Sequence, residues 1–292
     1  MNSILHHIPV MVKESLFYLD IKPHLIYMDG TIGQGGHTGY ILPNLSSRGK
    51  IIGIDKDIEV LDMCYQNFSA YNTQLSLHHN SYHRLSDILQ KEGIQSVEGI
   101  LLDLGLSSFQ LESETRGFSY SKNSLLDMRF DQTRGKPAVD FLKKLTQKDL
   151  EKILKKFGEE RYSRNIAYRI HRSPDLKTTS DLKNIIQKST PPGNRTKSFS
   201  RVFQAIRIAI NRELEILEKF LDTFIDYLSL GGKIVIISYH SLEDRLVKHA
   251  FKKLKQKGEV NILTKKPVTP SYEEISKNSR SRSAKLRAAE RI

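Results

Sequence analysis

The chain has 292 residues, 38% of them hydrophobic and 8% aromatic, so it is long enough for one large domain or for a core domain carrying a smaller one. No stretch approaches the roughly 18 consecutive apolar residues of a membrane span, and no basic segment followed by a long apolar run marks the start of the chain for secretion. A single cysteine, Cys64, excludes an intramolecular disulfide. These features predict a cytoplasmic protein that does not enter a membrane.

The charge of the chain is unevenly distributed. Lys and Arg number 46 against 33 Asp and Glu, a net charge of +13. Residues 1–111 carry 7 basic and 11 acidic side chains, whereas residues 112–292 carry 39 basic and 22 acidic ones. The stretch 245–292 alone has 14 basic and 4 acidic side chains. A basic surface beside a near-neutral region indicates a small-molecule site next to a polyanion-binding surface. A generally basic protein, in which codon usage favours Lys, is the alternative.

The first hundred residues predict strands that alternate with helices. Short apolar or β-branched runs predict strands at 25–28, 50–55, 75–78 and 97–102. Helical spacing of apolar side chains predicts helices between them, the clearest over 57–69 and 82–91. Continuous apolar strands separated by amphipathic helices are typical of a parallel sheet covered on both faces, so the predicted fold class is α/β.

The alternation breaks after Asp103. The segment 105–137 is rich in Ser, Gly and charge and too long for an ordinary connection, which predicts a functional role. Helical patterns then extend to Pro191-Pro192-Gly193, with Thr146 as a helix N-cap and Gly158 as the residue after a helix end. We therefore predict a helical insertion over 106–198 within a parent domain formed by 1–105 and 199–292.

The sheet pattern resumes after the insertion. Apolar residues from Phe199 to Leu228 keep a spacing of three to four, which predicts one long helix. Gly231 and Gly232 then predict a turn into a fifth strand over 233–238.

A glycine-rich loop, DGTIGQGGH over 29–37, follows the first strand at the position where doubly wound folds bind ligands. A dinucleotide fingerprint counted from Gly33 would need Gly or Ala at 38, where Thr38 stands. Asp29 would also repel a pyrophosphate, whereas S-adenosylmethionine carries an ammonium and a sulfonium. The loop therefore favours this cationic methyl donor over NAD, and a methyltransferase over a nicotinamide-dependent oxidoreductase.

Two further carboxylates end strands of the same predicted sheet. Asp55 ends the second strand, where an acid accepts the ribose hydroxyls of an adenosine group. Asp103 ends the fourth strand and faces the same crevice, where it would bind the ammonium of the donor, orient a target amine, or simply cap a loop. Tyr82, just beyond the third strand, is positioned either to stack on adenine or to pack in the core.

Other chemistry is not supported. The histidines lack zinc-ligand spacing, and His78 and His79 would point to opposite faces of a strand, so no metal is expected. Cys64 falls among apolar residues of a helix, which predicts a packed core residue and disfavours the cysteine-dependent methylation of a pyrimidine carbon. Ser238, His240 and Asp244 lie close in sequence, but proximity alone supplies no triad geometry.

The chain resembles the RsmH (MraW) family of bacterial methyltransferases, which act on the exocyclic N4 of a cytidine in 16S ribosomal RNA. The likeness runs through nine motifs in order, from the N-terminus to the C-terminus of the chain. They are HIPV (7–10), DGTIGQGGH (29–37), LLDLGLSS (101–108), RGFS (116–119), LDMRFD (126–131), GEER (158–161), FQAIR (203–207), SYHSLEDR (238–245) and SRSRSAKLR (279–287).

The resemblance implies a class I methyltransferase with a Rossmann-like, mostly parallel seven-stranded sheet and a helical insertion on the RNA-substrate side. It implies S-adenosylmethionine as donor, with contacts that are carried over residue by residue: Gly35, Gly36, His37, Asp55, Tyr82, Asp103 and Gln110. The implied target lies in the decoding region of the small ribosomal subunit. Asp103 is followed by Leu-Gly-Leu rather than the Pro-Pro-aromatic sequence of many amine methyltransferases, so their amine-orienting mechanism does not transfer directly.

Two hypotheses follow for the reaction. In the first, Asp103 or a nearby carbonyl accepts hydrogen bonds from the target amine while an extruded base is aligned with the methyl group. In the second, Arg and Lys of the insertion and of the C-terminal stretch position RNA through its phosphates. A non-catalytic RNA-binding assembly factor that retains a nucleoside pocket is the alternative function. The sequence does not indicate an oligomeric state.

Overall fold

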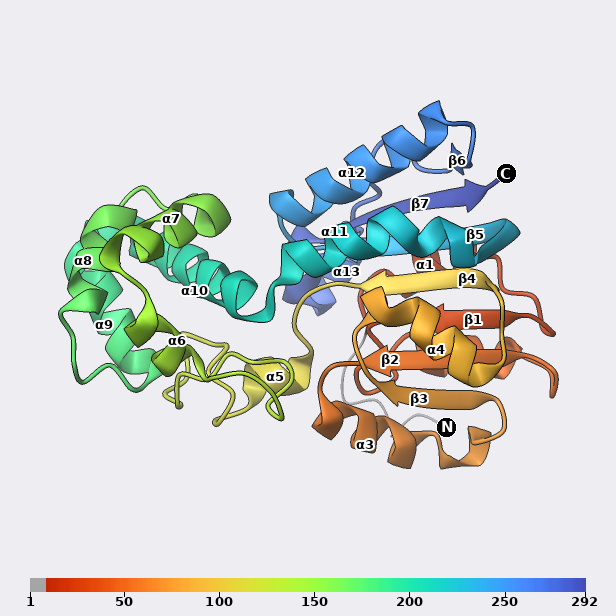
Figure 1. Cartoon of the computed structure of the whole chain (residues 1–292), viewed down its shortest axis with the longest axis horizontal. Coiled ribbons are helices and arrows are strands. Elements are labelled where there is room, and N and C mark those ends of the chain that lie inside the picture. Colours follow the sequence, from red (N-terminus) through yellow and green to blue (C-terminus); the bar gives the residue numbers. More distant parts are fainter. Residues whose placement is uncertain (1–8) are drawn as a thin grey trace. The chain divides into compact units, whose positions relative to one another are not determined.

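The computed structural model describes residues 9–292 and divides into two compact units (Figure 1). The first unit comprises the chain up to Gly105 together with Leu214–Ile292, and the second comprises Leu106–Glu213. The first two residues of the HIPV motif, His7 and Ile8, lie outside the described residues. Within the part of the chain that is described, no helix is both long and apolar enough to cross a membrane.

A seven-stranded sheet forms the centre of the first unit, which confirms the predicted fold class (Figure 1). The strand order is β3-β2-β1-β4-β5-β7-β6. Strands β1 to β5 pair in parallel, and β7 runs antiparallel to β5 and β6. The strands are β1 (Ile26–Asp29), β2 (Lys50–Asp55), β3 (Leu75–His79), β4 (Val97–Asp103), β5 (Leu228–Ser238), β6 (Val260–Ile262) and β7 (Lys285–Arg291).

Helices cover both faces of the sheet because successive side chains of its strands point to opposite sides. Ile100 and Leu102 of β4 lie in one core with α4, α11 and α12, whereas Leu101 between them lies in another core with α1 and α3. The helices of this unit are α1 (Val12–Leu19), α2 (Thr38–Ile41), α3 (Ile58–Asn67), α4 (Leu85–Glu92), α11 (Glu213–Thr223), α12 (Ser241–Gln256) and α13 (Tyr272–Lys277). Short 3-10 turns are η1 (Leu42–Asn44), η2 (Ser69–Tyr71), η3 (Tyr82–Arg84), η5 (Phe224–Tyr227) and η6 (Ser279–Ser283).

The second unit is helical and has a core of its own. Its elements are α5 (Ser108–Glu112), α6 (Ala138–Lys144), α7 (Gln147–Gly158), α8 (Ser163–His171), α9 (Thr179–Ser189), η4 (Pro192–Asn194) and α10 (Arg195–Asn211). Leu154, Ile166, Leu182 and Val202 from four of these helices are fully buried in one cluster. Thr146 caps α7 as predicted, its side chain accepting a hydrogen bond from the Asp149 amide.

The predicted single helix over 199–228 is wrong. Arg212 adopts a left-handed conformation with φ of 51° and separates α10 from α11. The apolar spacing continues across the break because both helices bury a stripe, but Phe203 belongs to the core of the second unit and Phe220 to a core of the first. The second unit accordingly runs to Glu213, not to 198 as we expected from sequence.

The basic C-terminal stretch is folded rather than an appended tail. Strand β7 lies between β5 and β6, and Leu286, Ala288 and Ala289 are fully buried. Arg287 is itself buried and donates to Asp244 Oδ1 over 2.7 Å. Its positive charge is therefore used inside the unit, and only the exposed cations of this stretch are available to a partner.

Gly231 and Gly232 lie within β5 instead of preceding it, since the strand begins at Leu228. Gly231 has a φ of 74°, and the pairing of β5 with β4 shifts register between Val97 and Gly99. A register shift with an unpaired glycine is the signature of a β-bulge, which explains why two glycines at this point do not end the strand.

Candidate methyl-donor site

Three carboxylates end neighbouring parallel strands of the first unit. Asp29 ends β1, Asp55 ends β2 and Asp103 ends β4, and the order β2-β1-β4 puts all three at one edge of the sheet. The chain proceeds from β1 outward to β2 and β3 and then returns to β4 on the other side of β1. Asp29 and Asp103 therefore flank the point where the strand order reverses, which is where open α/β sheets bind ligands.

The glycine loop between β1 and α2 is shaped by close contacts that only glycine allows. Gly35 has a φ of 87°, and a Cβ atom there would lie 2.2 Å from the ring of Phe68. A Cβ atom on Gly36 would lie 3.2 Å from Pro9. The helix that follows is a single turn, Thr38–Ile41, so the loop offers mainly its own backbone to a ligand.

Asp29 is buried beneath this loop and does not reach its surface. The Thr38 hydroxyl donates to Asp29 Oδ2 over 2.8 Å, and the Thr31 amide donates to Oδ1 over 3.4 Å. Burial raises the pKa of Asp29 to about 6. Thr38, which breaks the dinucleotide pattern, is thus the hydrogen-bond partner of Asp29, the carboxylate that would repel a pyrophosphate. Because Asp29 is buried, it would influence a ligand at the loop surface through its charge and not by contact.

Asp55 holds the loop against the end of β2. Its Oδ2 accepts a hydrogen bond from the Gly33 amide over 2.9 Å, and its Oδ1 accepts one from the Asp57 amide over 3.0 Å. Burial raises the pKa of Asp55 to about 6. Asp57 is itself the N-cap of α3, where its side chain accepts a hydrogen bond from the Glu59 amide. Since each carboxylate oxygen has two lone pairs, Asp55 retains acceptor capacity for ribose hydroxyls.

Asp103 is the most strongly perturbed of the three carboxyl groups. Tyr239, the residue after β5, donates its hydroxyl to Asp103 Oδ1 over 2.8 Å, and the Asp103 amide donates to Thr31 Oγ1 over 2.7 Å. Burial raises the pKa of Asp103 to about 7, although its side chain is still 23% exposed. Among the residues that the structure describes, none donates a hydrogen bond to Oδ2.

His37 ends the glycine loop beside Asp103. Its Nε2 lies 2.9 Å from the Val10 carbonyl oxygen, which makes Nε2 the donor, and its Nδ1 lies 3.8 Å from Asp103 Oδ2. Burial lowers the pKa of His37, so the ring is neutral at pH 7. Nδ1 of this tautomer is an acceptor that faces the same space as Asp103 Oδ2.

Two predicted donor contacts have structural roles of their own. Tyr82 is buried, with its ring centroid 5.3 Å from that of Phe220 in an edge-to-face arrangement, so it packs in the core beneath Gly30. Gln110 lies in the second unit, where its side chain accepts from the Ser107 amide in the capping box of α5. Contact of Tyr82 and Gln110 with a donor stays a prediction.

Residues set aside at the sequence level behave as expected. Cys64 is fully buried, and burial raises its pKa to about 12, so it is not a nucleophile. His78 contacts Glu92 whereas His79 contacts the Lys56 carbonyl. Asp244 pairs with Arg287 and Lys285, which leaves it no part in a triad with Ser238.

Sequence reasoning missed Tyr239, Thr31 and Phe68. Tyr239 donates to the Asp103 carboxylate, Thr31 accepts from the Asp103 amide and so ties the start of the glycine loop to β4, and Phe68 packs against Gly35. Tyr239 could have been predicted as a site residue, because it directly follows β5, the strand beside β4, and a polar side chain there faces the same edge of the sheet. Phe68 was not, since nothing in the sequence pairs it with Gly35.

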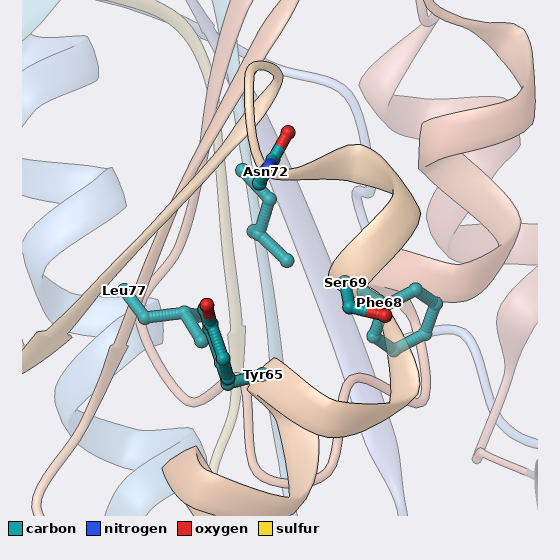
Figure 2. Close-up of a pocket in the computed structure, with 6 residues that line it drawn as sticks. Tyr65, Phe68, Ser69, Asn72 and Leu77 are labelled. Carbon is teal, nitrogen blue, oxygen red and sulfur yellow. The ribbon is translucent and has the colours of Figure 1, made fainter.

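A small apolar hollow lies on the flank of the sheet, between the end of α3 and β3 (Figure 2). It is lined by Tyr65, Phe68, Ser69, Asn72, Leu75 and Leu77, none of which is charged. Leu75 and Leu77 pair with Ile51 and Gly53 in the body of the sheet, away from the strand ends that carry the carboxylates. The hollow therefore lies apart from the strand ends that carry the candidate donor-site residues.

Comparison with known proteins decides the family. The model of the MraW methylase family matches residues 4–292. This chain is a member of the MraW methylase family. S-adenosylmethionine, predicted from the glycine loop and the carboxylates, is the methyl donor of such enzymes.

Relatives of this MraW methylase match it along its length. Ribosomal RNA small subunit methyltransferase H of Caldicellulosiruptor saccharolyticus is 44% identical over 98% of this chain and 99% of its own. Proteins of the same name from Kosmotoga olearia and Clostridium botulinum are 44% and 40% identical, each over 98% of this chain and over 97% and 99% of their own. An rRNA methylase structure from Streptococcus thermophilus has a TM-score of 0.47 at 11% identity, covering 96% of this chain and 95% of that one.

The residues at the strand ends fit a donor of this kind. A Cβ atom on Gly35 or Gly36 would meet Phe68 or Pro9, so these two glycines let the loop pack closely against the protein itself and hold its shape. Asp55 keeps acceptor lone pairs that would suit ribose hydroxyls, and negative charge on Asp29 and Asp103 at the same strand ends would favour a cationic donor.

Proposed function

We propose that this protein uses S-adenosylmethionine to methylate the exocyclic N4 of a cytidine in the decoding region of small-subunit ribosomal RNA. The observation that carries the proposal is the Asp103 carboxylate, which has one oxygen held by Tyr239 and one oxygen facing the site. The names of the 40–44% identical relatives support ribosomal RNA of the small subunit as the substrate. Such a substrate would be met in the cytoplasm.

In the donor half of the proposed site, Gly35 and Gly36 bind the donor through their backbone and Asp55 accepts the ribose hydroxyls. His37 closes the loop by its bond to the Val10 carbonyl and presents a neutral ring. When bound, the donor would supply an activated methyl group on a sulfonium: the sulfur–methyl bond breaks as the nitrogen–methyl bond forms, and sulfur keeps the electron pair as a neutral thioether. The protein's principal task is then to align the target nitrogen with that methyl group and to exclude water.

In the amine half, Asp103 Oδ2 accepts a hydrogen bond from the cytidine amino group. The lone pair of this nitrogen is conjugated into the ring, and an acceptor on the amino hydrogen helps to develop it as the methyl group transfers. Tyr239 holds the other carboxylate oxygen, so Oδ2 keeps a fixed direction. After transfer the nitrogen carries an extra proton, which Asp103, with a pKa raised to about 7 by burial, is suited to accept.

Attack from nitrogen is favoured over attack from a pyrimidine carbon. Methylation of carbon 5 usually needs a thiolate that adds to the ring, and the one cysteine of the chain is buried in the core with its pKa raised to about 12. A carboxylate at the end of β4 is instead the acceptor that an amino group requires.

The second unit supplies the proposed RNA-binding side. It carries 23 basic and 12 acidic residues, a net charge of +11 of the total of +13. Cations at this density bind phosphates without reading sequence and give affinity that falls with salt.

Detection of N4-methylcytidine in 16S rRNA, by mass spectrometry of nucleosides from cells with and without the gene, tests the proposal. We expect the modified nucleoside to disappear with the gene and to return with the wild-type gene but not with Asp103→Ala. Unchanged N4-methylcytidine would contradict the proposal. A normal ribosome-assembly phenotype restored by Asp103→Ala would favour the non-catalytic assembly factor.

A second measurement separates the two roles of Asp103. In Asp103→Asn, donor affinity is measured by calorimetry and the single-turnover rate at saturating donor and RNA. We expect the rate to fall by at least about tenfold because the amide cannot accept the proton. Loss of donor affinity with an unchanged rate would restrict Asp103 to donor binding.

A further inference from the structure

The exposed face of α8 combines arginines with an aromatic ring. Ser163, Ile166, Ala167 and Ile170 form its buried face. On the opposite face, Arg164, Tyr168 and Arg172 follow one another at intervals of four residues, so they lie in one row along the helix. All three are exposed, and so is Arg161, which precedes the helix. Tyr168 leaves 41% of its surface exposed to solvent.

Tyr168 and Arg172 are already arranged as a stacked pair. The Arg172 guanidinium lies over the Tyr168 ring with its carbon 4.3 Å from the ring centroid, and it also donates to the tyrosine hydroxyl. The pair fixes the plane of the ring and covers one of its faces. Tyr168 keeps 41% of its surface exposed alongside this contact, so part of the ring remains open to a flat group without further ordering of the side chain.

The arginines of this row are not neutralised within the protein. The segment 161–172 contains four arginines and no acidic residue. In the part of the chain that the structure describes, none of Arg161, Arg164, Arg169 and Arg172 forms an ion pair with a carboxylate, whereas Lys152 of α7 is paired with Asp149. Their charge is therefore available to an external anion.

An exposed row of cations on α12 provides a comparison within the same chain. Arg245, Lys248, Lys252 and Lys255 also share one face at helical spacing, but no exposed Phe, Tyr or Trp lies among them. Such a row attracts phosphates of any nucleic acid. The ring on α8 adds a surface on which a base can stack, and only a base that is not paired in a helix is free to do so.

We propose that this face of α8 binds unpaired nucleotides of the RNA substrate. A base stacks on the open face of Tyr168, and Arg161, Arg164 and Arg172 contact the flanking phosphates. This proposal rests on the proposed function for the identity of the nucleic acid and adds to it a preference for single-stranded RNA and the surface that produces it.

The test compares two RNA probes of equal length, a single-stranded oligonucleotide and a hairpin that is paired throughout its stem. Fluorescence anisotropy with the full-length protein gives the affinity for each probe as a function of salt. We expect Tyr168→Ala to weaken single-strand binding about tenfold with an unchanged salt slope, and to change hairpin binding less than twofold. Tyr168→Phe should keep wild-type affinity because it keeps the ring.

The arginines should give a different signature. Arg164→Ala is expected to lower the slope of log affinity against log salt by about 0.7 on the single strand, since one phosphate contact is lost. Two matched variants act as controls. Tyr272→Ala removes a tyrosine that is 88% exposed beside Glu273 and Glu274, and Arg48→Ala removes an exposed arginine before β2. Both controls should bind the two probes like the wild type.

Equal weakening of both probes by Tyr168→Ala, or no effect on either, would overturn the proposal, as would wild-type binding by Arg164→Ala. Thermal unfolding shows whether each variant is folded. If Tyr168→Ala does not fold, Tyr168→Phe and Arg164→Ala still test the proposal. The outcome is separable from that for the proposed function. Single-strand preference carried by Tyr168 in a protein that makes no N4-methylcytidine would refute the reaction and leave the surface standing.

Discussion

The Tyr239 hydroxyl donates a hydrogen bond of 2.8 Å to Asp103 Oδ1, joining the ends of the neighbouring strands β5 and β4. Burial raises the pKa of Asp103 to about 7, and the hydroxyl opposes this by stabilising the charged form. Gly105 allows the chain to pass over the same ring, since a Cβ atom there would lie 3.3 Å from it. The tyrosine therefore controls both the direction and the charge of the carboxylate.

Substitution of Tyr239 by Phe should keep the packing and remove this hydrogen bond. Because a hydrogen bond to a charged group contributes about 1.5–3 kcal/mol, we expect the pKa of Asp103 to rise and the single-turnover methylation rate near pH 7 to fall about tenfold. The pH midpoint of the rate should move upward, measured over about pH 6 to 9 at saturating donor.

Tyr272→Phe, which removes the hydroxyl of a tyrosine that is 88% exposed to solvent, should leave the rate and its midpoint unchanged. A rate that fell equally at every pH, with the midpoint unmoved, would show that the ring rather than the hydroxyl matters. In that case Tyr239 would be a packing residue only.

Donor affinity should rise with pH. Burial raises the pKa of Asp29 and of Asp55 to about 6 and that of Asp103 to about 7, so the free protein holds protons on these groups in mildly acidic solution. A cationic donor favours the charged carboxylates and lowers these pKa values, which means that binding releases protons. We expect calorimetry to show tighter binding as the pH rises from about 5.5 to 7.5.

Titrations in two buffers of different ionisation enthalpy should reveal the released protons directly. Asp103→Asn should remove the part of the pH dependence near pH 7 and keep the part near pH 6, which arises from Asp29 and Asp55. An affinity independent of pH across this range, without proton release, would contradict the assignment of these carboxylates to the donor site.

The glycine loop should not tolerate a side chain at position 35. Gly35→Ala places a Cβ atom 2.2 Å from Phe68 and forces alanine to a φ of 87°, so the loop must move. We expect donor affinity to fall at least about tenfold. Gly93→Ala is the matched control, because Gly93 has a φ of 67° with open space around it and lies at the end of α4. It should lose some stability and keep its donor affinity.

Much of the donor site was readable from the sequence because it depends on local order along the chain. Each of Asp29, Asp55 and Asp103 directly ends an apolar strand, and parallel strands bring such ends to one edge of a sheet. The hydrogen bond between Thr38 and Asp29 was hidden in the same loop. Thr38 and Asp29, which were separate reasons to exclude a dinucleotide site, are hydrogen-bonded to each other.

The features that escaped prediction depend on contacts between distant parts of the chain. Apolar spacing reports that a helix face is buried but not in which core, so the break at Arg212 left no trace in the pattern. Net charge likewise does not distinguish an exposed Lys252 from a buried Arg287. Deletion of residues 277–292, which the charge alone would recommend as a test of RNA binding, would remove the inner strand β7.

The end of α7 provides a test of stability in the second unit. Gly158 was expected to adopt the left-handed conformation there, but it is the last helical residue, and Glu159 has the positive φ of 49°. Gly158 serves a close approach instead, since a Cβ atom on it would lie 2.6 Å from the Arg201 carbonyl oxygen of α10. The two positions should therefore respond in opposite ways to substitution.

Gly158→Ala should destabilise the protein by about 1–2 kcal/mol, because overpacking against the α10 backbone outweighs the better helix propensity of alanine. Glu159→Gly should stabilise it by about 0.5–1 kcal/mol, since glycine relieves the left-handed strain of an exposed side chain. Urea midpoints at unchanged m-value measure both effects. As a control, Lys152→Gly at an exposed position inside α7 should lower the free energy of unfolding by about 1 kcal/mol. If Glu159→Gly lowered it by the same amount, α7 would continue through Glu159, and the left-handed conformation at its end would be wrong.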